Sequence, residues 1–189
     1  MSDFQEDLKR YRNRKTGKFD WNEPSIIVVA LYRWGRWIRS LRFAPVRFLL
    51  NCLFVPLYGF FACFIGIALP RSAKIGGGLR IDHFGAIVIS PGAVIGRNCT
   101  IRQGVTIGNR KLLDDIPVVG DNVNIGAGAK ILGAIHIGND VKIGANSVVL
   151  CDVPDHSTVV GVPARVIHHA FEETDEMQGK EVLDDDRLS

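Results

Sequence analysis

The residue in this chain best suited to acid–base chemistry is His83, in the segment Asp82-His83-Phe84-Gly85. An imidazole titrates near neutral pH, so it can take a proton from a hydroxyl group and hand it on. The alternative is a histidine that only satisfies a hydrogen bond at a chain corner. The other four histidines are weaker candidates, because one sits on a repeat face and three lie in the C-terminal turn and tail.

A six-residue repeat defines the elements that must position His83. Every sixth residue from Ile89 to Val149 is Ile, Leu or Val, eleven in all, and six of them are followed by Gly. A period of six fits neither an α-helix nor an ordinary strand. It is typical of a parallel β-helix, in which each hexad forms one short strand and one corner. We expect the branched side chains to fill the core and the glycines to permit the backbone conformation of the corners.

The repeat is interrupted at two places, and these are the candidate functional positions. Ile81 is two residues out of phase with Ile89, so two residues are inserted in the segment that contains His83. The second place is segment 109–117, which keeps the register through Leu113 but is polar and lacks the corner glycine. It is either a normal coil or a short protruding loop.

The N-terminal region has a different composition. We expect segment 25–42 to form one helix. Its arginines recur at every third position from Arg33 to Arg42, and tryptophans lie beside them. This composition is typical of a helix that lies in a membrane interface. Segment 51–69 has no charged residue for 19 positions, just long enough to span a bilayer, but Pro56 and Gly59 interrupt it. We therefore favour a helical hairpin or re-entrant segment in one leaflet, attached through residues 25–69. The alternative is a helical domain packed on the β-helix or within an oligomer.

Four segments are expected along the chain. They are a polar basic arm or short helix at 1–24, a helical membrane-interfacial region at 25–70, the β-helix at 71–167 and a flexible acidic tail at 168–189. The net charge of +3 says little about partners, but no acidic residue occurs between Glu23 and Asp82. Together with the absence of a signal peptide, these features predict a location on the cytoplasmic face of the plasma membrane.

Several classes of site are not expected. There is no set of three histidines with metal-binding spacing, so we expect no metal. Phosphate-binding and dinucleotide-binding glycine motifs are missing as well. Because the N-terminal arginines lie in an apolar background, we expect them to meet lipid rather than nucleic acid.

The segment from Lys74 to Arg165 resembles the hexapeptide-repeat acyltransferases. It is most similar to the serine O-acetyltransferases, in particular to a membrane-associated branch of exopolysaccharide and colanic-acid synthesis. The matching motifs are Lys74-Ile-Gly76, Asp82-His83-x-Gly85-x-Ile-Val-Ile89, Val105-Thr-Ile-Gly108, Gly126-Ala-Gly-Ala-Lys-Ile-Leu-Gly133, Ile143-Gly-Ala-x-Ser-Val-Val149 and Gly161-Val-Pro-Ala-Arg165. The resemblance implies a left-handed β-helix with three hexads per coil, a homotrimer, and acetyl-CoA in a groove between neighbouring subunits.

The resemblance also assigns roles to particular residues. His83 matches the catalytic histidine, and Asp82 matches the carboxylate that contacts the substrate beside it. Either Lys142 or Arg165 would meet the phosphates of the nucleotide, where a cation is favourable. The residues assigned to acetyl-CoA are Asn109, Ala127, Lys142, Ala145 and Arg165.

Two departures from the family pattern bear on the acceptor. The serine enzymes carry an Arg-His pair just before the proline that matches Pro117, where this chain has Asp115 and Ile116. They also carry a carboxylate fifteen residues before the catalytic histidine that orients it, and here that position is Ala68. Without the arginine, an amino-acid carboxylate loses its bidentate partner. Without the carboxylate, the histidine needs a backbone carbonyl or a carboxylate of a neighbouring subunit.

These departures decide the expected function. We expect an acetyl-CoA-dependent O-acetyltransferase that acts on a sugar hydroxyl in exopolysaccharide or lipid-linked glycan synthesis. The alternative is a serine O-acetyltransferase of cysteine biosynthesis. A non-catalytic β-helix scaffold at the membrane is the third possibility, which the intact Asp82-His83 interruption disfavours.

Overall fold

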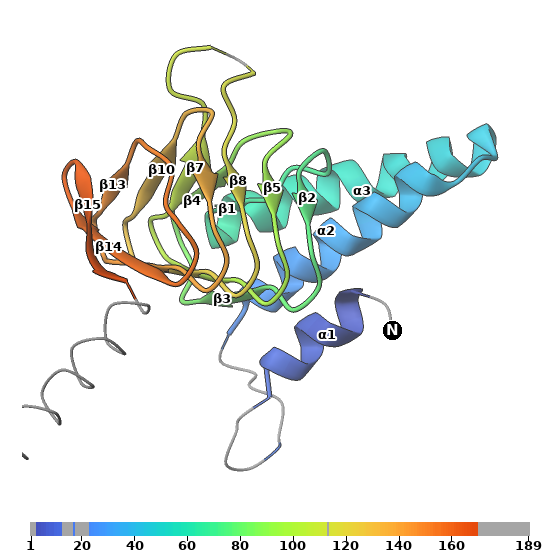
Figure 1. Ribbon diagram of the computed structural model, residues 1–189. Coiled ribbons are helices and arrows are strands. Elements are labelled where there is room, and N and C mark those ends of the chain that lie inside the picture. Colours follow the sequence, from blue (N-terminus) through green and yellow to red (C-terminus); the bar gives the residue numbers. More distant parts are fainter. Residues whose placement is uncertain (1–2, 13–16, 18–22, 113, 170–189) are drawn as a thin grey trace, which may run out of the picture.

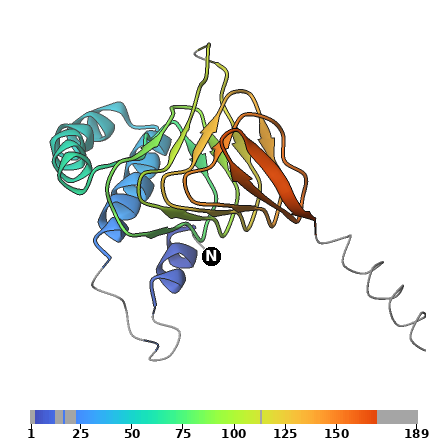
Figure 2. The ribbon, with the colours of Figure 1, turned by 90° about the vertical axis from the view of Figure 1, so that its left-hand side faces the viewer.

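The computed structural model describes residues 3–12, 17, 23–112 and 114–169. Three helices stand at one end of a stack of β-coils, and the strand pair β14–β15 stands at the other end (Figures 1 and 2). The helices are α1 (Asp3–Arg10), α2 (Ser25–Ser40) and α3 (Ala44–Ile65). The predicted β-helix with an N-terminal helical region is therefore confirmed.

The coils form three sheets of short, almost entirely parallel strands. The first sheet contains β1 (Ile67–Ala68), β4 (Ile87–Ile89), β7 (Thr106–Gly108), β10 (Lys130–Leu132) and β13 (Val148–Val149). The second contains β2 (Lys74–Ile75), β5 (Val94–Ile95), β8 (Val118–Val119) and β11 (His136–Ile137). The third contains β3 (Arg80–Asp82), β6 (Thr100–Arg102), β9 (Asn124–Ile125), β12 (Lys142–Ile143), β14 (Ser157–Gly161) and the antiparallel β15 (Ala164–His169).

The residues of the six-residue repeat fill the core as predicted. From Ile89 to Val149, each described member of the series is at most 3% exposed. A second inward set lies two residues earlier in each hexad and includes Ala93, Cys99 and Val105, all fully buried. Because each hexad sends two side chains inward, the interior is filled without long side chains, which explains the high share of Ile, Val and Ala in this region.

The expected reason for the repeat glycines is wrong. The six glycines that follow the inward residues do not have positive φ, and left-handed corners are formed by other residues, among them Asn98, Asn122 and Asn146. Five of the six are needed because neighbouring strands lie only about 4.8 Å apart, whereas a Cβ atom on Gly108 would make an ordinary contact with Ser90 at 3.5 Å. A Cβ atom on Gly96 would lie 2.5 Å from the carbonyl carbon of Gly120 in the next coil.

Residue pairing between neighbouring coils gives the length of each coil. Ile89 pairs with Ile107, three hexads further along the chain, which is the regular length of a coil. Ile67 pairs with Ile87, so the first coil is longer than three hexads by the predicted two-residue insertion. Ile107 pairs with Ile131, four hexads further along the chain, so one extra hexad is added after β7.

The added hexad forms a protruding loop, which decides between the two alternatives for segment 109–117. The loop stands out from the β-helix in Figures 1 and 2. Leu113, which we expected to keep the repeat register, lies outside the described residues. At the base of the loop Asp115 accepts the backbone N–H groups of Lys111 and Ala134, and Ile116 packs against the core.

The N-terminal region differs from the prediction in two respects. The uncharged run ends in β1, so the strands begin at Ile67, inside the segment assigned to helices. The helical hairpin consists of α2 and α3, and α3 continues through Pro56 as one helix. At the other end β15 reaches His169, and residues 170–189 of the expected tail lie outside the described residues.

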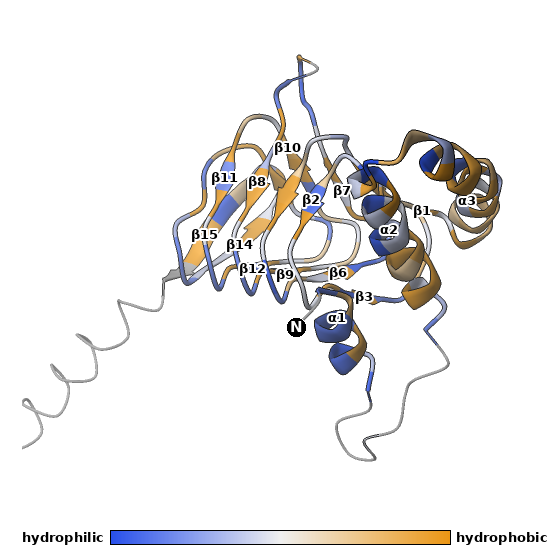
Figure 3. Ribbon diagram, turned by 90° about the vertical axis from the view of Figure 1, so that its right-hand side faces the viewer, coloured by the Kyte–Doolittle hydropathy of each residue, from blue (hydrophilic) through white to orange (hydrophobic). Residues whose placement is uncertain are grey.

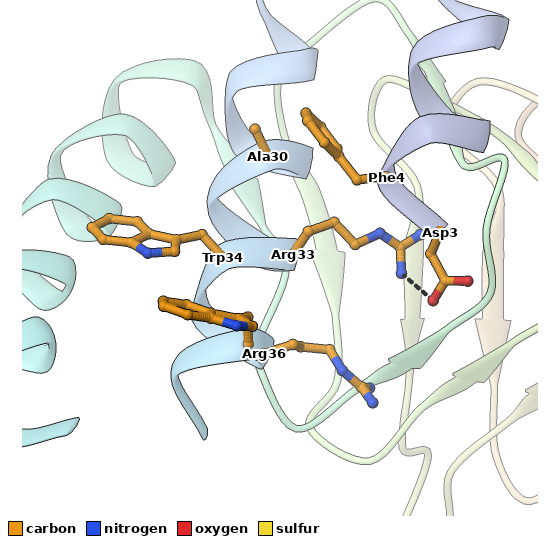
Figure 4. A pocket seen from close by; sticks show the side chains of 7 residues that line it. Asp3, Phe4, Ala30, Arg33, Trp34 and Arg36 are labelled. Carbon is orange, nitrogen blue, oxygen red and sulfur yellow. Dashed lines mark ion pairs between the residues drawn. The ribbon is translucent and has the colours of Figure 1, made fainter. Parts of the chain in front are cut away.

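The arginines of α2 face the protein rather than only a membrane surface. Arg33 forms a bidentate pair with the fully buried Asp7 at 2.8 and 3.1 Å and an ion pair with Asp3 at 3.5 Å. Figure 4 shows it reaching from α2 to the start of α1, across a cavity of about 430 Å³. Arg36 donates to the carbonyl of Ala73. These two side chains therefore join α2 to α1 and to the first coil.

The helices also cap the open edge of the first coil with tyrosine hydroxyls. Tyr58 of α3 accepts the N–H of Leu69 at 2.9 Å and donates to its carbonyl at 2.8 Å. Tyr32 of α2 accepts the N–H of Ile75 at 3.1 Å and donates to the carbonyl of Ala73 at 2.8 Å. A phenol can both accept and donate, so one side chain satisfies two backbone groups of an unpaired strand.

The third tyrosine of the chain caps the third sheet. Tyr11 accepts the N–H of Ile81 at 2.9 Å and contacts the Ser25 hydroxyl at 3.2 Å, while Ser25 donates to the carbonyl of Ile81 at 2.9 Å. Burial raises the pKa of Tyr11 to about 12, so its proton stays in place throughout the physiological range. Each sheet of the first coil is therefore closed by a tyrosine from the helical region.

Removal of one capping hydroxyl should destabilise the fold. We expect Tyr32→Phe to lower the free energy of unfolding by about 1–3 kcal/mol, because the buried N–H of Ile75 loses its acceptor. Urea denaturation measures the change. Ser40→Ala is the control, since that exposed hydroxyl bonds only within its own helix. Equal midpoints for Tyr32→Phe and wild type would contradict the capping role.

Candidate functional site

His83 lies where the chain turns from the third sheet to the first sheet, between β3 and β4. Corners of successive coils stack along this edge through backbone hydrogen bonds, which run from Gly104 to Gly85, from Gly128 to Gln103 and from Asn146 to Ala127. We call residues 83–86, 103–104, 127–128 and 145–146 the corner column. The inserted residues make its first corner larger than the others, so the histidine stands out from an otherwise regular edge.

The His83 side chain is exposed and faces a carboxylate. Its backbone is left-handed, with φ of 63°, and its side chain is 69% exposed. Glu23 Oε1 lies 3.8 Å from His83 Nδ1, and Glu23 Oε2 accepts the backbone N–H of His83 at 3.3 Å. The Glu23 side chain is only 15% exposed. One ring nitrogen therefore faces a partly buried carboxylate, while the opposite nitrogen can face a substrate.

Asp82 lies beside this histidine in a mixed-charge surface. Its carboxylate forms an ion pair with Arg80 on the same strand. In the ladder of the third sheet Asp82 is the register partner of Arg102 on β6. The residue before the histidine is thus a carboxylate paired with one guanidinium, and a second arginine lies on the neighbouring strand. Such a mixed-charge surface suits a small zwitterionic or polar acceptor.

An open cleft of about 380 Å³ lies further along the corner column. It brings together three of the five residues assigned to acetyl-CoA, namely Ala127, Lys142 and Ala145. Its floor is bare backbone, because a Cβ atom on Gly126 would lie 2.5 Å from the nitrogen of Ala145. The other lining residues are Arg102, Asn124, Gly126, Ile143, Gly144 and Thr158. A slender ligand chain can reach the backbone there, and two cations are available for phosphate groups.

The other two assigned residues lie elsewhere in the chain. Asn109 follows β7 at a different corner, where its Oδ1 is 3.5 Å from the Ser90 hydroxyl. Arg165 is an exposed residue of β15, and its guanidinium donates to the carbonyl of Ala164 at 3.2 Å. Neither lines the cleft of its own chain, so their assignment to acetyl-CoA stays a prediction.

Sequence reasoning missed Glu23 and Arg102 as members of this region. Glu23 is remote from His83 in the chain, and the one signal it gave was its place as the last acidic residue before Asp82. Arg102 and Asn124 occupy outward positions of β6 and β9, and Arg102 donates to the Asn124 side chain at 2.9 Å. Their register in the ladder could have indicated that they lie in line with Asp82.

Comparison with known proteins places this site in a family. Residues 116–151 match the bacterial transferase hexapeptide family (six repeats). The serine acetyltransferase of Synechococcus elongatus is 37% identical over 163 residues, which are 85% of this chain and 64% of that protein. A solved serine acetyltransferase in complex with CoA is 34% identical with a TM-score of 0.73, over 87% of this chain and 68% of that chain. The chain belongs to the serine acetyltransferase family of hexapeptide transferases.

A solved structure of soybean serine acetyltransferase complexed with serine is similar to this chain to the same degree. It is 35% identical with a TM-score of 0.72, over 87% of this chain and 68% of that chain. The likeness therefore includes the helices as well as the β-helix. The match spans 64% of the length of the Synechococcus protein.

These comparisons contradict the expected sugar acceptor. The similar proteins are serine acetyltransferases, so the alternative stated from the sequence is the better one, and the exopolysaccharide branch has no support. The error came from the weight given to Asp115 and Ile116. Their positions serve the base of the protruding loop, where they bond and pack against the β-helix. The missing Arg-His pair is a weak argument about the acceptor, because the strand that pairs with Asp82 carries another arginine, Arg102.

Proposed function

We propose that this chain is a serine O-acetyltransferase that transfers the acetyl group of acetyl-CoA to the hydroxyl of serine. The observation that carries the proposal is the position of His83 at the head of the corner column, with the cleft of Ala127, Lys142 and Ala145 further along it, in a member of the serine acetyltransferase family. A base and a thioester site on one rigid edge are the two parts that acetyl transfer needs.

The reaction follows from this arrangement. His83 takes the proton of the serine hydroxyl through the ring nitrogen opposite Glu23, and the serine oxygen attacks the thioester carbonyl carbon. Backbone N–H groups of the coil stabilise the oxyanion of the tetrahedral intermediate. The carbon–sulfur bond then breaks, and the proton held by His83 passes to the departing thiolate. The products are O-acetylserine and CoA, and His83 is again neutral.

The charged groups of the site suit both substrates. Asp82 supplies a carboxylate for the ammonium group of serine, and Arg102 supplies a guanidinium for its carboxylate. Lys142 provides a point charge for a phosphate of CoA at the far end of the cleft.

The site is open in a single chain, because the His83 side chain is 69% exposed. We therefore extend the proposal to a homotrimer in which a neighbouring copy covers the cleft. In that assembly the neighbouring copy that covers the cleft would contribute its Asn109 and Arg165 to the acetyl-CoA site. The exposed apolar residue Val88, on the outer face of β4, is available for such a contact.

The role of His83 gives the first test of function. We expect His83→Ala to lower kcat for serine by about 10²- to 10⁴-fold, because a general base contributes about that factor. CoA release measures the rate, and light scattering checks that the particle mass is unchanged. His136→Ala, an exposed histidine on β11, is the control. Full activity of His83→Ala, or a wild type that acetylates another hydroxyl compound but not serine, would refute the proposal.

The cleft gives a second test. We expect Lys142→Ala to raise KM for acetyl-CoA about tenfold and to leave kcat nearly unchanged, because a charge-assisted hydrogen bond to phosphate contributes about 1.5–3 kcal/mol to binding. Lys9→Ala, an exposed lysine of α1, is the control. An unchanged KM in the Lys142 variant would remove the cleft from the acetyl-CoA site.

We also propose that α3 lies on the cytoplasmic face of the plasma membrane. In the part of the chain that the structure describes, α3 is the helix that is long and apolar enough to cross a bilayer. In Figure 3 its ribbon is coloured mostly as hydrophobic. Its exposed apolar side chains are Val46, Phe48, Leu49, Leu53, Val55, Phe60 and Phe64. A soluble monomer rarely exposes so large an apolar surface.

A cationic cleft lies beside this surface and favours an anionic bilayer as the partner. The cleft, of about 350 Å³, contains Arg36, Arg39, Arg71 and Lys74, with two serines. Arg71 stacks on the buried Phe54 of α3 at 4.6 Å and donates to the side chain of Asn51 on the same helix at 2.6 Å, so the cleft is joined to α3. Anionic lipid phosphates suit such a site, and the cytoplasmic leaflet is rich in them. We expect α3 to lie in one leaflet, with the cleft at head-group depth.

Vesicle co-sedimentation tests this location. We expect the protein to bind vesicles that contain phosphatidylglycerol and to bind pure phosphatidylcholine vesicles more weakly. Phe48→Ser with Leu49→Ser should abolish binding, while Lys111→Gln on the protruding loop should leave it unchanged. If vesicles are not bound and the double variant instead halves the particle mass, α3 is an interface between copies of the chain and the membrane proposal is wrong.

A further inference from the structure

His83 stands exposed on a corner of the β-helix, and the partner of its Nδ1 decides which ring nitrogen can act as the base. The carboxylate nearest to that nitrogen is Glu23, from the segment just before α2. We propose that Glu23 is a positioning residue, which accepts the Nδ1–H of His83 and leaves Nε2 free to take the proton of the acceptor hydroxyl. This inference rests on the proposed function for its kinetic consequence only.

The Glu23 carboxylate faces both the backbone N–H and the ring Nδ1 of His83. One carboxylate oxygen accepts the backbone N–H of His83 at 3.3 Å, and the other lies 3.8 Å from Nδ1. A small rotation of the imidazole shortens the second distance to a hydrogen bond, and catalytic hydrogen bonds are often long before substrate binds. A carboxylate on Nδ1 fixes both the ring orientation and the tautomer, as it does in serine hydrolases.

Glu23 is itself held in place by its neighbours in the chain. Ser25, two residues on, is fully buried and donates to the carbonyl of Ile81, two residues before His83. Pro24 has φ of −65°, and the Glu23 carbonyl accepts the N–H of Ile26 at 3.4 Å. The carboxylate and the histidine are therefore both anchored close to one backbone contact, which limits their relative motion.

The other charged groups near this histidine have partners of their own. Asp82 is paired with Arg80 on the same strand, and Arg102 bonds to Asn124. Glu23 is thus the carboxylate that faces the imidazole, and its charge also acts on Arg80.

The test compares Glu23→Gln with a matched pair elsewhere in the fold. His156 Nδ1 lies 3.8 Å from Asp140 Oδ2, the same separation as in the proposed pair, and neither residue lines the cleft. We expect Glu23→Gln to lower kcat at least tenfold with KM for both substrates unchanged, because an amide at this place favours the wrong tautomer. Asp140→Asn should leave both constants unchanged.

Nitrogen-15 spectra of the imidazoles provide a readout that does not depend on activity. In the wild type we expect His83 to carry its proton on Nδ1, and in Glu23→Gln we expect the signal of the Nε2–H form. The Asp140→Asn variant should leave the His83 signals in place. Wild-type tautomer in Glu23→Gln, or a kcat loss without a tautomer change, would overturn the inference. If the wild type fails to acetylate serine, the proposed function fails while the spectra still decide the role of Glu23.

Discussion

The structure depends on one constraint, which is that the first coil of a β-helix has backbone groups that no earlier coil can satisfy. Unpaired backbone groups at a strand edge lower the stability of the fold when they are buried. When they are exposed, they can pair with the strands of another chain. Here Tyr58, Tyr32 and Tyr11 meet the three sheets of that coil, and each hydroxyl accepts from one backbone N–H. The helical region is therefore the cap of the β-helix, and its packing also brings Glu23 to the histidine corner.

The parts of the fold that sequence could predict are those that repeat. The inward residues of each hexad are buried because every coil imposes the same environment on them. His83 could be found because an insertion in a regular series is visible without any structure. The role of the corner glycines was misjudged, because the close approach of Gly96 to Gly120 in the next coil depends on the spacing between coils, which a single hexad does not reveal.

The rest depends on docking between distant segments. Nothing in the local sequence connects Glu23 to His83, since their approach requires Ser25 to bond to β3. For the same reason Arg33 was expected to face lipid, although its partner Asp7 lies in a separate helix earlier in the chain. The acceptor was misjudged for a related reason. Asp115 bonds to backbone groups at the base of a loop, so the residue at that position is explained by the loop structure and not by the substrate.

The order of the caps along the chain has a consequence for synthesis on the ribosome. All three tyrosines precede the strands that they close. The helices therefore leave the ribosome before β1, β2 and β3, so the capping residues are available when the first coil forms. Each later coil can then add to an edge that is already capped, which limits the exposure of the first coil to other nascent chains. A β-helix capped at its far end only would expose its first coil throughout translation.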